Sequence, residues 1–396
     1  MIPEVRKAYN HDFSESKYKA FLADLDGLYN HQITFRVAET PVFVGSGFKS
    51  KLINASNDII DFLTKEDVKK LTAAAIPPAL NVPNETDHTL FLALDFAVVK
   101  EEGELEPRLI EMQGFPSLFG WQDVIAEKYR EHFTVPNDLQ SHFGLSSEEY
   151  RGKMKTILLN GHKPENVILL EIDPLKQNTA IDFLVTKDFT GVEPVHIGDV
   201  TREGRRLFYR KDGERTEIRR IYNRVIFDEL VKRTDLQLSF NLTEDVDVEW
   251  AGHPNWFYRI SKYTMPFIRS KYIPECKFLS GYKEFPKDLE NYVLKPLFSF
   301  SGSGVIFHVT SDDLKNIPAG QRHEFMLQRK VEYQPVVQAP DGMVKVEIRL
   351  LFIWEDGQAR PQLITNLARL SRGEMIGVKY NKDKSWVGGS VCFFEK

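Results

Sequence analysis

Residues 292–307 read YVLKPLFSFSGSGVIF, a pattern that predicts a strand, a glycine-rich loop at 298–304 and a returning strand at 305–309. Lys295 comes at the end of the first strand, so its ammonium group would lie beside the loop. The loop can turn sharply and direct backbone N–H groups toward an anion through Ser299, Gly302, Ser303 and Gly304. Because a plain hairpin also needs glycine, the loop alone leaves a structural turn and a phosphate lid equally open.

Two common phosphate motifs are excluded for this loop. The Walker A pattern GxxxxGK[ST] is absent, and no helical pattern opens directly after the glycines, as a dinucleotide fingerprint requires. Templates for serine hydrolases and zinc enzymes, such as GxSxG and HExxH, are absent as well. The role of the loop therefore has to be judged from the sequence around it.

The rest of the chain has the pattern of a mixed α and β protein. A strand at 89–99, an acidic turn and a strand at 108–112 predict a hairpin that carries Asp95 and Glu111. Strand, helix and strand patterns follow at 167–172, 178–189 and 192–197, the order of a parallel α/β layer. We further expect a hairpin across 206–222 with its turn at Asp212-Gly213. Helices are expected at 226–233 and 261–271, and strands at 325–331, 344–354 and within 362–394.

Composition narrows the class of protein. A chain of 396 residues suggests two or three domains, and its net charge of −5 gives no global reason to expect nucleic acid as a partner. The N-terminal sequence lacks the apolar core of a signal peptide, and no uncharged run is long enough to span a bilayer. The two cysteines form neither a disulfide framework nor a zinc motif. We therefore expect a cytoplasmic protein without a membrane partner; its oligomeric state is open.

Residues 261–307 resemble the nucleotide-binding subdomain of the ATP-grasp family. In that family a lysine opens a helix, a short phrase ending in proline follows, and a strand with a Lys-Pro and glycine loop comes next; Lys262, residues 272–274 and residues 293–305 stand in that order. The resemblance implies that Lys262, Lys295 and the loop contact ATP phosphates. It also implies that residues 325–332 form the adenine hinge, with Gln328 in the hinge and Glu332 on the ribose.

The next family phrase is matched by residues 347–349, Glu-Ile-Arg, whose arginine would face the transferred phosphate. A guanidinium group can bind phosphate oxygens in bidentate fashion, which suits Arg349 to stabilising charge on that group. The alternative for Arg349 is a surface ion pair on an alternating strand. Downstream, Asn366 and Arg369 are candidate contacts to triphosphate or to a substrate carboxylate, with a structural role equally open.

The metal-binding phrase of the family is found near the start of the chain. Asp95, Glu111 and Gln113 on the 89–113 hairpin resemble its Mg²⁺ ligands, with glutamine in place of the usual asparagine. This rotated order is similar to that of the circularly permuted branch, which includes glutathionylspermidine synthetase-like enzymes. Oxygen ligands across a hairpin suit Mg²⁺ that bridges ATP phosphates. A buried carboxylate paired with a basic residue is the alternative reading.

Residues 202–224 allow two further interpretations. This segment holds nine Lys/Arg against four Asp/Glu, interleaved with aromatic residues, which is typical of a solvated hairpin and also of a nucleic-acid-binding ribbon. Its last residues, 221–224, resemble a phrase near the substrate site of glutathione synthetase-like enzymes, which implies that Arg224 holds a substrate carboxylate.

Together the resemblances imply an α+β, circularly permuted ATP-grasp fold with an additional α/β domain. We expect an N-terminal core part with the metal hairpin at 1–135, a substrate domain at 136–254, a nucleotide-binding subdomain at 255–340 and completing strands at 341–396. The implied function is an ATP- and Mg²⁺-dependent carboxylate-amine ligase, acting on a small-molecule or peptide carboxylate and an amine, with Arg349, Lys295 and Arg369 as catalytic residues. A phosphotransferase and a nucleic-acid-binding protein are the alternatives.

Overall fold

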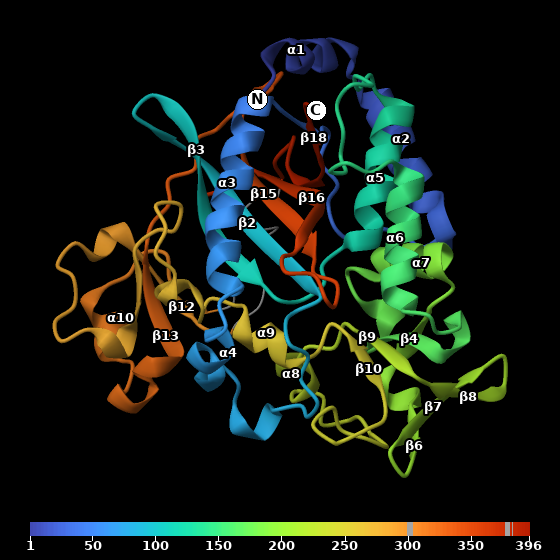
Figure 1. The fold of residues 1–396 in the computed structure, drawn as a ribbon. Coiled ribbons are helices and arrows are strands. Elements are labelled where there is room, and N and C mark those ends of the chain that lie inside the picture. The colour runs from blue at the N-terminus through green and yellow to red at the C-terminus, as the bar shows by residue number, and fades with distance from the viewer. Residues whose placement is uncertain (299–303, 377–380, 382) are drawn as a thin grey trace.

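The computed structural model describes residues 1–298, 304–376, 381 and 383–396 (Figure 1). The predicted loop residues Ser299, Gly302 and Ser303 lie outside the described part. The fold is a mixed α and β arrangement of several sheets, as the sequence predicts.

A six-stranded sheet lies at the centre and joins two strands from the N-terminal third of the chain with strands from its C-terminal part (Figure 1). Its order is β17 (Gly388–Ser390), β16 (Gln362–Ser371), β15 (Gly342–Ile353), β2 (Phe91–Glu101) and β3 (Glu104–Gln113), with β14 (Val337–Ala339) paired to β15. The β2–β3 hairpin confirms the predicted one, and β2 pairs with β15 in antiparallel fashion. Residues about 250 positions apart in sequence are thereby direct neighbours, as in the pair Asp95 and Arg349.

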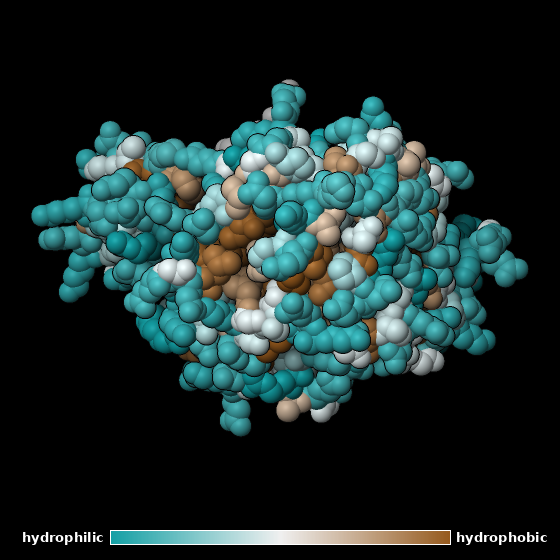
Figure 2. Space-filling view, turned by 90° about the horizontal axis from the view of Figure 1, so that it is seen from above, coloured by the Kyte–Doolittle hydropathy of each residue, from teal (hydrophilic) through white to brown (hydrophobic). Residues whose placement is uncertain are grey.

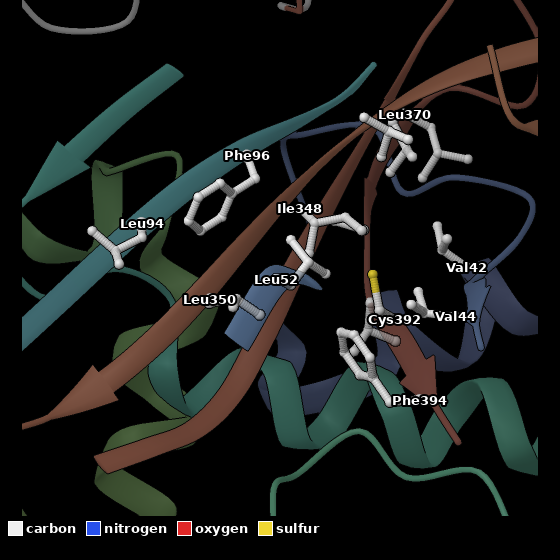
Figure 3. Packing of buried hydrophobic residues seen from close by; sticks show 14 of the residues in the cluster. Val42, Val44, Leu52, Leu94, Phe96, Ile348, Leu350, Leu370, Cys392 and Phe394 are labelled. Carbon is white, nitrogen blue, oxygen red and sulfur yellow. The ribbon is translucent and has the colours of Figure 1, made fainter. Parts of the chain in front are cut away.

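Alternation along these strands produces the main core. Leu94 and Phe96 of β2 point to one face, beside Ile348 and Leu350 of β15 (Figure 3). Helix α3 (Ser46–Leu63) covers this face through residues such as Leu52. The helices α1 (Pro3–Asp12), α2 (Glu15–Gly27), α4 (Val68–Leu71) and α5 (Phe119–His132) complete the N-terminal third.

A second layer is the predicted parallel α/β unit. Its strands run in the order β10 (Glu249–Ala251), β9 (Arg220–Asn223), β4 (Val167–Glu171) and β5 (Glu193–His196), all parallel. Helices α6 (Ser147–Leu159) and α7 (Ala180–Thr190) belong to it, and α8 (Phe227–Leu230) and α9 (Asn255–Arg259) follow. The antiparallel ribbon β6 (Thr201–Glu203), β7 (Arg206–Lys211) and β8 (Glu214–Ile218) confirms the hairpin around Asp212 and Gly213.

A third sheet stands beside the central one and contains the first residues of the 292–307 stretch (Figure 1). It consists of β11 (Cys276–Phe278), β13 (Phe325–Arg329) and β12 (Tyr292–Pro296), with α10 (Ser311–Lys315) nearby. Two expectations are wrong here. The helix at 261–271 is only a 3-10 turn at Met265–Phe267, because Pro266 cannot donate a helical hydrogen bond. The returning strand at 305–309 is reduced to a single bridge between Leu294 and Ile306.

The two ends of the chain lie side by side at the top of Figure 1. There β1 (Val42–Val44) pairs in parallel with β18 (Cys392–Phe394). Viewed from this side, hydrophobic side chains show through an otherwise hydrophilic surface (Figure 2). Within the described part of the chain, every helix is too short or too polar to cross a bilayer.

A buried polar chain connects α5, the segment before α6 and strand β16. His142 donates from Nε2 to Asp123 (2.8 Å), and its Nδ1 lies 3.0 Å from the Thr365 hydroxyl. Arg151 of α6 donates to the other oxygen of Asp123 (2.6 Å). Burial alone would raise the pKa of Asp123, but the hydrogen bonds from His142 and Arg151 hold it below its usual value. Because Thr365 is fully buried, these hydrogen-bonded side chains stabilise the fold and do not reach a substrate.

We predict that Asp123→Asn lowers the free energy of unfolding at pH 7 by about 2 kcal/mol, because the imidazole and guanidinium lose an ionised partner. A carboxylate whose pKa is lower in the folded state stabilises the protein above its unfolded pKa, and this contribution is lost as pH falls. The difference between variant and wild type should therefore shrink below about pH 4 in urea unfolding. The exposed control Asp138→Asn should unfold like the wild type, and an equal deficit for Asp123→Asn at pH 7 and pH 3 would contradict the assignment.

Candidate functional site

The second face of the central sheet changes from apolar to charged along its strands. Phe91 and Ala93 of β2 are buried against the α/β layer, and Asp95 is the next residue on the same face. On the neighbouring strand β15, Leu351 is apolar and Arg349 follows on the same face. Register places Arg349 opposite Asp95, so the two charged residues that adjoin the apolar part of this face meet.

Asp95 is held by two arginines. Nε and Nη2 of Arg349 donate to its two oxygens at 2.5 and 2.6 Å, and Nη2 of Arg369 also donates to it. Burial alone would raise the pKa of Asp95, but the charges of the two guanidinium groups hold it below its usual value. Asp95 is therefore an ionised carboxylate in a bidentate pair, which is the arrangement that a buried charge requires.

Glu347 and Tyr333 extend this cluster. Glu347 lies opposite Arg369 in the β15–β16 register, and Nη2 of Arg369 is 2.9 Å from its Oε1. The hydroxyl of Tyr333 donates to Oε2 of Glu347 at 2.5 Å. Burial raises the pKa of Glu347 and neighbouring Asp95 adds to this, while Arg369 opposes it. Sequence reasoning missed both residues, although Glu347 stands two positions before Arg349 and so had to share its face.

Two lysines from outside the central sheet approach its edge strand β3. Lys295, at the end of β12, donates from Nζ to the carbonyl oxygen of Ile110 at 3.3 Å. The buried Lys262 has its Nζ 3.6 Å from Oε1 of Glu111. Burial lowers the pKa of Lys295 to about 8, with Glu111 opposing and Lys262 adding to the shift. Both lysines thus meet β3, although Lys262 reaches it from a turn and not from the expected helix.

The predicted nucleotide hinge contains an unsatisfied amide. Gln328 of β13 is 2% exposed, and neither end of its carboxamide has a hydrogen-bond partner among the described residues. Buried polar atoms without partners are uncommon in proteins, so such an amide is suited to a ligand. Glu332, the expected ribose contact, is exposed just beyond β13.

Of the four residues named for the predicted phosphate lid, Gly304 lies in the described part of the chain. Its φ is +71°, and a Cβ atom there would lie 2.9 Å from Cγ of Pro296. Both the left-handed backbone and this close approach to the residue after Lys295 require glycine. The chain therefore returns tightly against the end of β12.

The expected metal ligands do not fit together as one site. Both oxygens of Asp95 are engaged by guanidinium groups, which excludes them from an ion unless those pairs break. Glu111 is directly opposite Asp95 in register, and Gln113 is opposite Ala93; both side chains are half-buried. Glu111 and Gln113 keep oxygen donors of the type that Mg²⁺ prefers. Mg²⁺ binding remains a prediction, and a three-ligand set that includes Asp95 is not supported by this geometry.

Arg224 lies where the α/β layer meets the central sheet. It follows β9 directly, and its Nη1 donates to the carbonyl oxygen of Pro116, in the segment that follows β3. Its guanidinium stands over the rings of Phe115 and Phe183, and its buried Nε has no partner among the described residues. The next residue of that segment, Ser117, accepts from Nη1 of Arg349 at 2.7 Å. Arg224 and the charged cluster therefore border the same short segment.

Asn366 does not belong to this site, which corrects the expectation that it contacts a ligand. Asn366 and Arg369 are an odd number of positions apart in β16, so their side chains point to opposite faces of the sheet. Its amide donates to the carbonyl oxygens of Ser141 and Cys392 at 2.9 and 3.0 Å, and its Oδ1 accepts from the N–H of Cys392 at 2.7 Å. Asn366 therefore fastens β18 to the sheet.

Most basic residues of the ribbon form ion pairs, some of them with acidic residues at 244–249 that sequence reasoning did not connect to it. Arg205 is paired with Asp245 and Asp247, and Arg202 with Glu244. Ion pairs also join Arg215 to Glu203, Arg219 to Glu217 and Arg220 to Glu249. A charge run that is already paired offers little to a polyanion, because phosphate binding depends on cations that are available to it.

Comparison with known proteins supports the fold. No family model matches the chain, and no curated protein matches its sequence. Among solved structures, the chain is similar to a glutathione synthetase-like effector (GSS30) from Globodera pallida in its apo form, with a TM-score of 0.55 and 9% identity. The similarity covers 91% of this chain and 90% of that chain. The chain thus has a fold like that of this glutathione synthetase-like protein.

We predict that Asn366→Ala lowers the free energy of unfolding by about 2–3 kcal/mol, because it leaves buried groups of Ser141 and Cys392 without a partner. Binding of ATP, or of inorganic tripolyphosphate, by the folded variant should equal that of the wild type. Thermal unfolding and calorimetric titration of the same preparation separate the two effects. A stable Asn366→Ala protein with weakened anion binding would show that Asn366 belongs to the site after all.

Proposed function

We propose that this protein is an ATP-dependent ligase of the ATP-grasp type, which activates a carboxylate and joins it to an amine. The observation that carries the proposal is the meeting of four cations at one part of the central sheet. Arg349 and Arg369 come from the sheet itself, while Lys262 and Lys295 come from outside it and approach edge strand β3 close to Glu111. Four cations around three carboxylates (Asp95, Glu111 and Glu347) leave a net charge of +1 when all seven groups are ionised.

This excess of positive charge suits a triphosphate. Phosphoryl transfer needs little covalent chemistry from a protein, since positioning and charge stabilisation supply most of the catalysis. Lys262 and Lys295 would neutralise phosphate oxygens, and the unpartnered Gln328 amide would hydrogen-bond the base. Lys295 directly precedes Pro296, and Gly304 lies close to the ring of Pro296. The nucleotide would then lie between the β11–β13–β12 sheet and the central sheet.

The proposed reaction has two steps. An oxygen of the substrate carboxylate attacks the γ-phosphorus of ATP, the bond to the β-phosphate oxygen breaks, and ADP leaves with that electron pair. The nitrogen of the amine then attacks the acyl carbon, phosphate leaves and the nitrogen loses a proton. Arg369, which is partly exposed, would stabilise the charge on the transferred group. Arg224 would bind a second carboxylate of the substrate. Since the expected metal ligands do not fit as a set, no step is assigned to Mg²⁺.

Removal of Lys295 tests nucleotide binding. We predict that Lys295→Ala weakens ATP binding by about a hundredfold, because a charge-assisted hydrogen bond to phosphate is lost. Lys283→Ala, which removes an exposed lysine near the same small sheet, is the matched control and should bind like the wild type. Isothermal calorimetry measures both. Equal ATP affinity of the wild type and Lys295→Ala would refute a nucleotide site at this position.

Turnover separates ligation from simple phosphoryl transfer. We expect ADP release from the wild type to require both a carboxylate and an amine, with one amide formed per ADP. The measurement is a screen of amino acids, short peptides and amines by a coupled ADP assay, followed by mass spectrometry of the products. A phosphorylated product formed at the same rate without any amine would show a phosphotransferase and not a ligase.

A further inference from the structure

The carboxylate of Asp95 stands where the family resemblance suggests a metal ligand, yet its surroundings are those of an arginine anchor. We propose that Asp95 is a positioning residue, which holds Arg369 to bind an anion and does not ligate a metal. The inference rests on the proposed binding of a polyphosphate at this site. It assigns the anion contact to Arg369 and a scaffolding role to Arg349.

Arg349 is fully committed within the protein. Its Nε and Nη2 donate to Asp95, and its Nη1 donates to Ser117 at 2.7 Å. The side chain is only 7% exposed. All three nitrogens are therefore engaged, and a ligand that displaced Asp95 would leave a buried guanidinium without its counter-charge. Breaking a buried pair on one side in this way is strongly destabilising.

Arg369 is held differently. Both of its ion pairs, to Asp95 and to Glu347, use the same nitrogen, Nη2. Its Nε is buried and has no hydrogen-bond partner among the described residues, while the side chain as a whole is 36% exposed. Two carboxylates thus fix one terminal nitrogen of a guanidinium whose side chain still reaches solvent. Such preorganised donors bind phosphate oxygens without a further ordering cost.

The surroundings of Asp95 do not suit a metal ion. Asp95 is 2% exposed, and both of its oxygens already accept from guanidinium groups. The nearest carboxylate in register, Glu111, has Lys262 at 3.6 Å. A cation placed there would have to displace guanidinium groups that already neutralise Asp95, and it would lie beside their positive charges. The pairing of Asp95 with two arginines therefore argues against a metal at this carboxylate.

The test uses inorganic tripolyphosphate without metal, and Mn²⁺ without nucleotide, each titrated into the full chain. We expect Asp95→Asn and Arg369→Gln each to weaken tripolyphosphate binding by about tenfold to a hundredfold, the usual effect of losing a supporting contact. The double variant should bind no worse than Arg369→Gln alone, because Asp95 acts through that arginine. A merely structural role of Asp95 would give additive losses and so overturn the proposal.

Three further results would also overturn it: a wild type that binds no tripolyphosphate, an Arg369→Gln protein that binds it normally, or an Asp95→Asn protein that loses only Mn²⁺ binding. Asp138→Asn is the exposed carboxylate control, and it should bind tripolyphosphate like the wild type. If Asp95→Asn does not fold, Arg369→Gln still decides, because it leaves the pair between Asp95 and Arg349 intact. Since neither probe contains a nucleotide or reports turnover, a failure of the proposed ligase activity would be seen separately.

Discussion

The bidentate pair between Asp95 and Arg349 is the interaction on which the centre of this protein depends. Both side chains are buried in the central sheet, and neither charge is tolerable there alone. Their pairing requires that β2 and β15 align in one register only, because a slip of one residue would turn one of the charges into the apolar core. The ion pair therefore specifies how the β2–β3 hairpin pairs with the C-terminal strand β15.

The same pair determines the chemistry of the face. Arg369 and Glu347 gather around Asp95, and Tyr333 completes the hydrogen bonds of Glu347. Two lysines then arrive from outside the sheet, which makes the face positive where it is open. The proposed anion site is thus built on a cluster whose innermost members are structural, and the partly exposed Arg369 links these members to the proposed ligand.

Local sequence patterns were sufficient for most elements of the fold. A continuous apolar run predicted β2, alternation predicted β15, and the Asp212-Gly213 pair predicted the turn of the ribbon, since these signals act over a few residues. The expected helix at 261–271 did not form, because Pro266 and the contacts of Lys262 with β3 outweigh its apolar spacing. Among site residues, Arg349, Arg369, Lys262 and Lys295 come together as expected, whereas Asn366 points to the opposite face.

By itself, the sequence determined the types of the elements and the presence of Asp95, Glu111, Lys295 and Arg349 near strand ends and loops. Only the tertiary structure decided what each charge faces. Asp95 meets two arginines more than 250 residues away, and the basic ribbon meets acidic residues at 244–249. The physical reason is that electrostatic roles depend on register and packing between distant segments, while secondary structure depends on spacing within one segment.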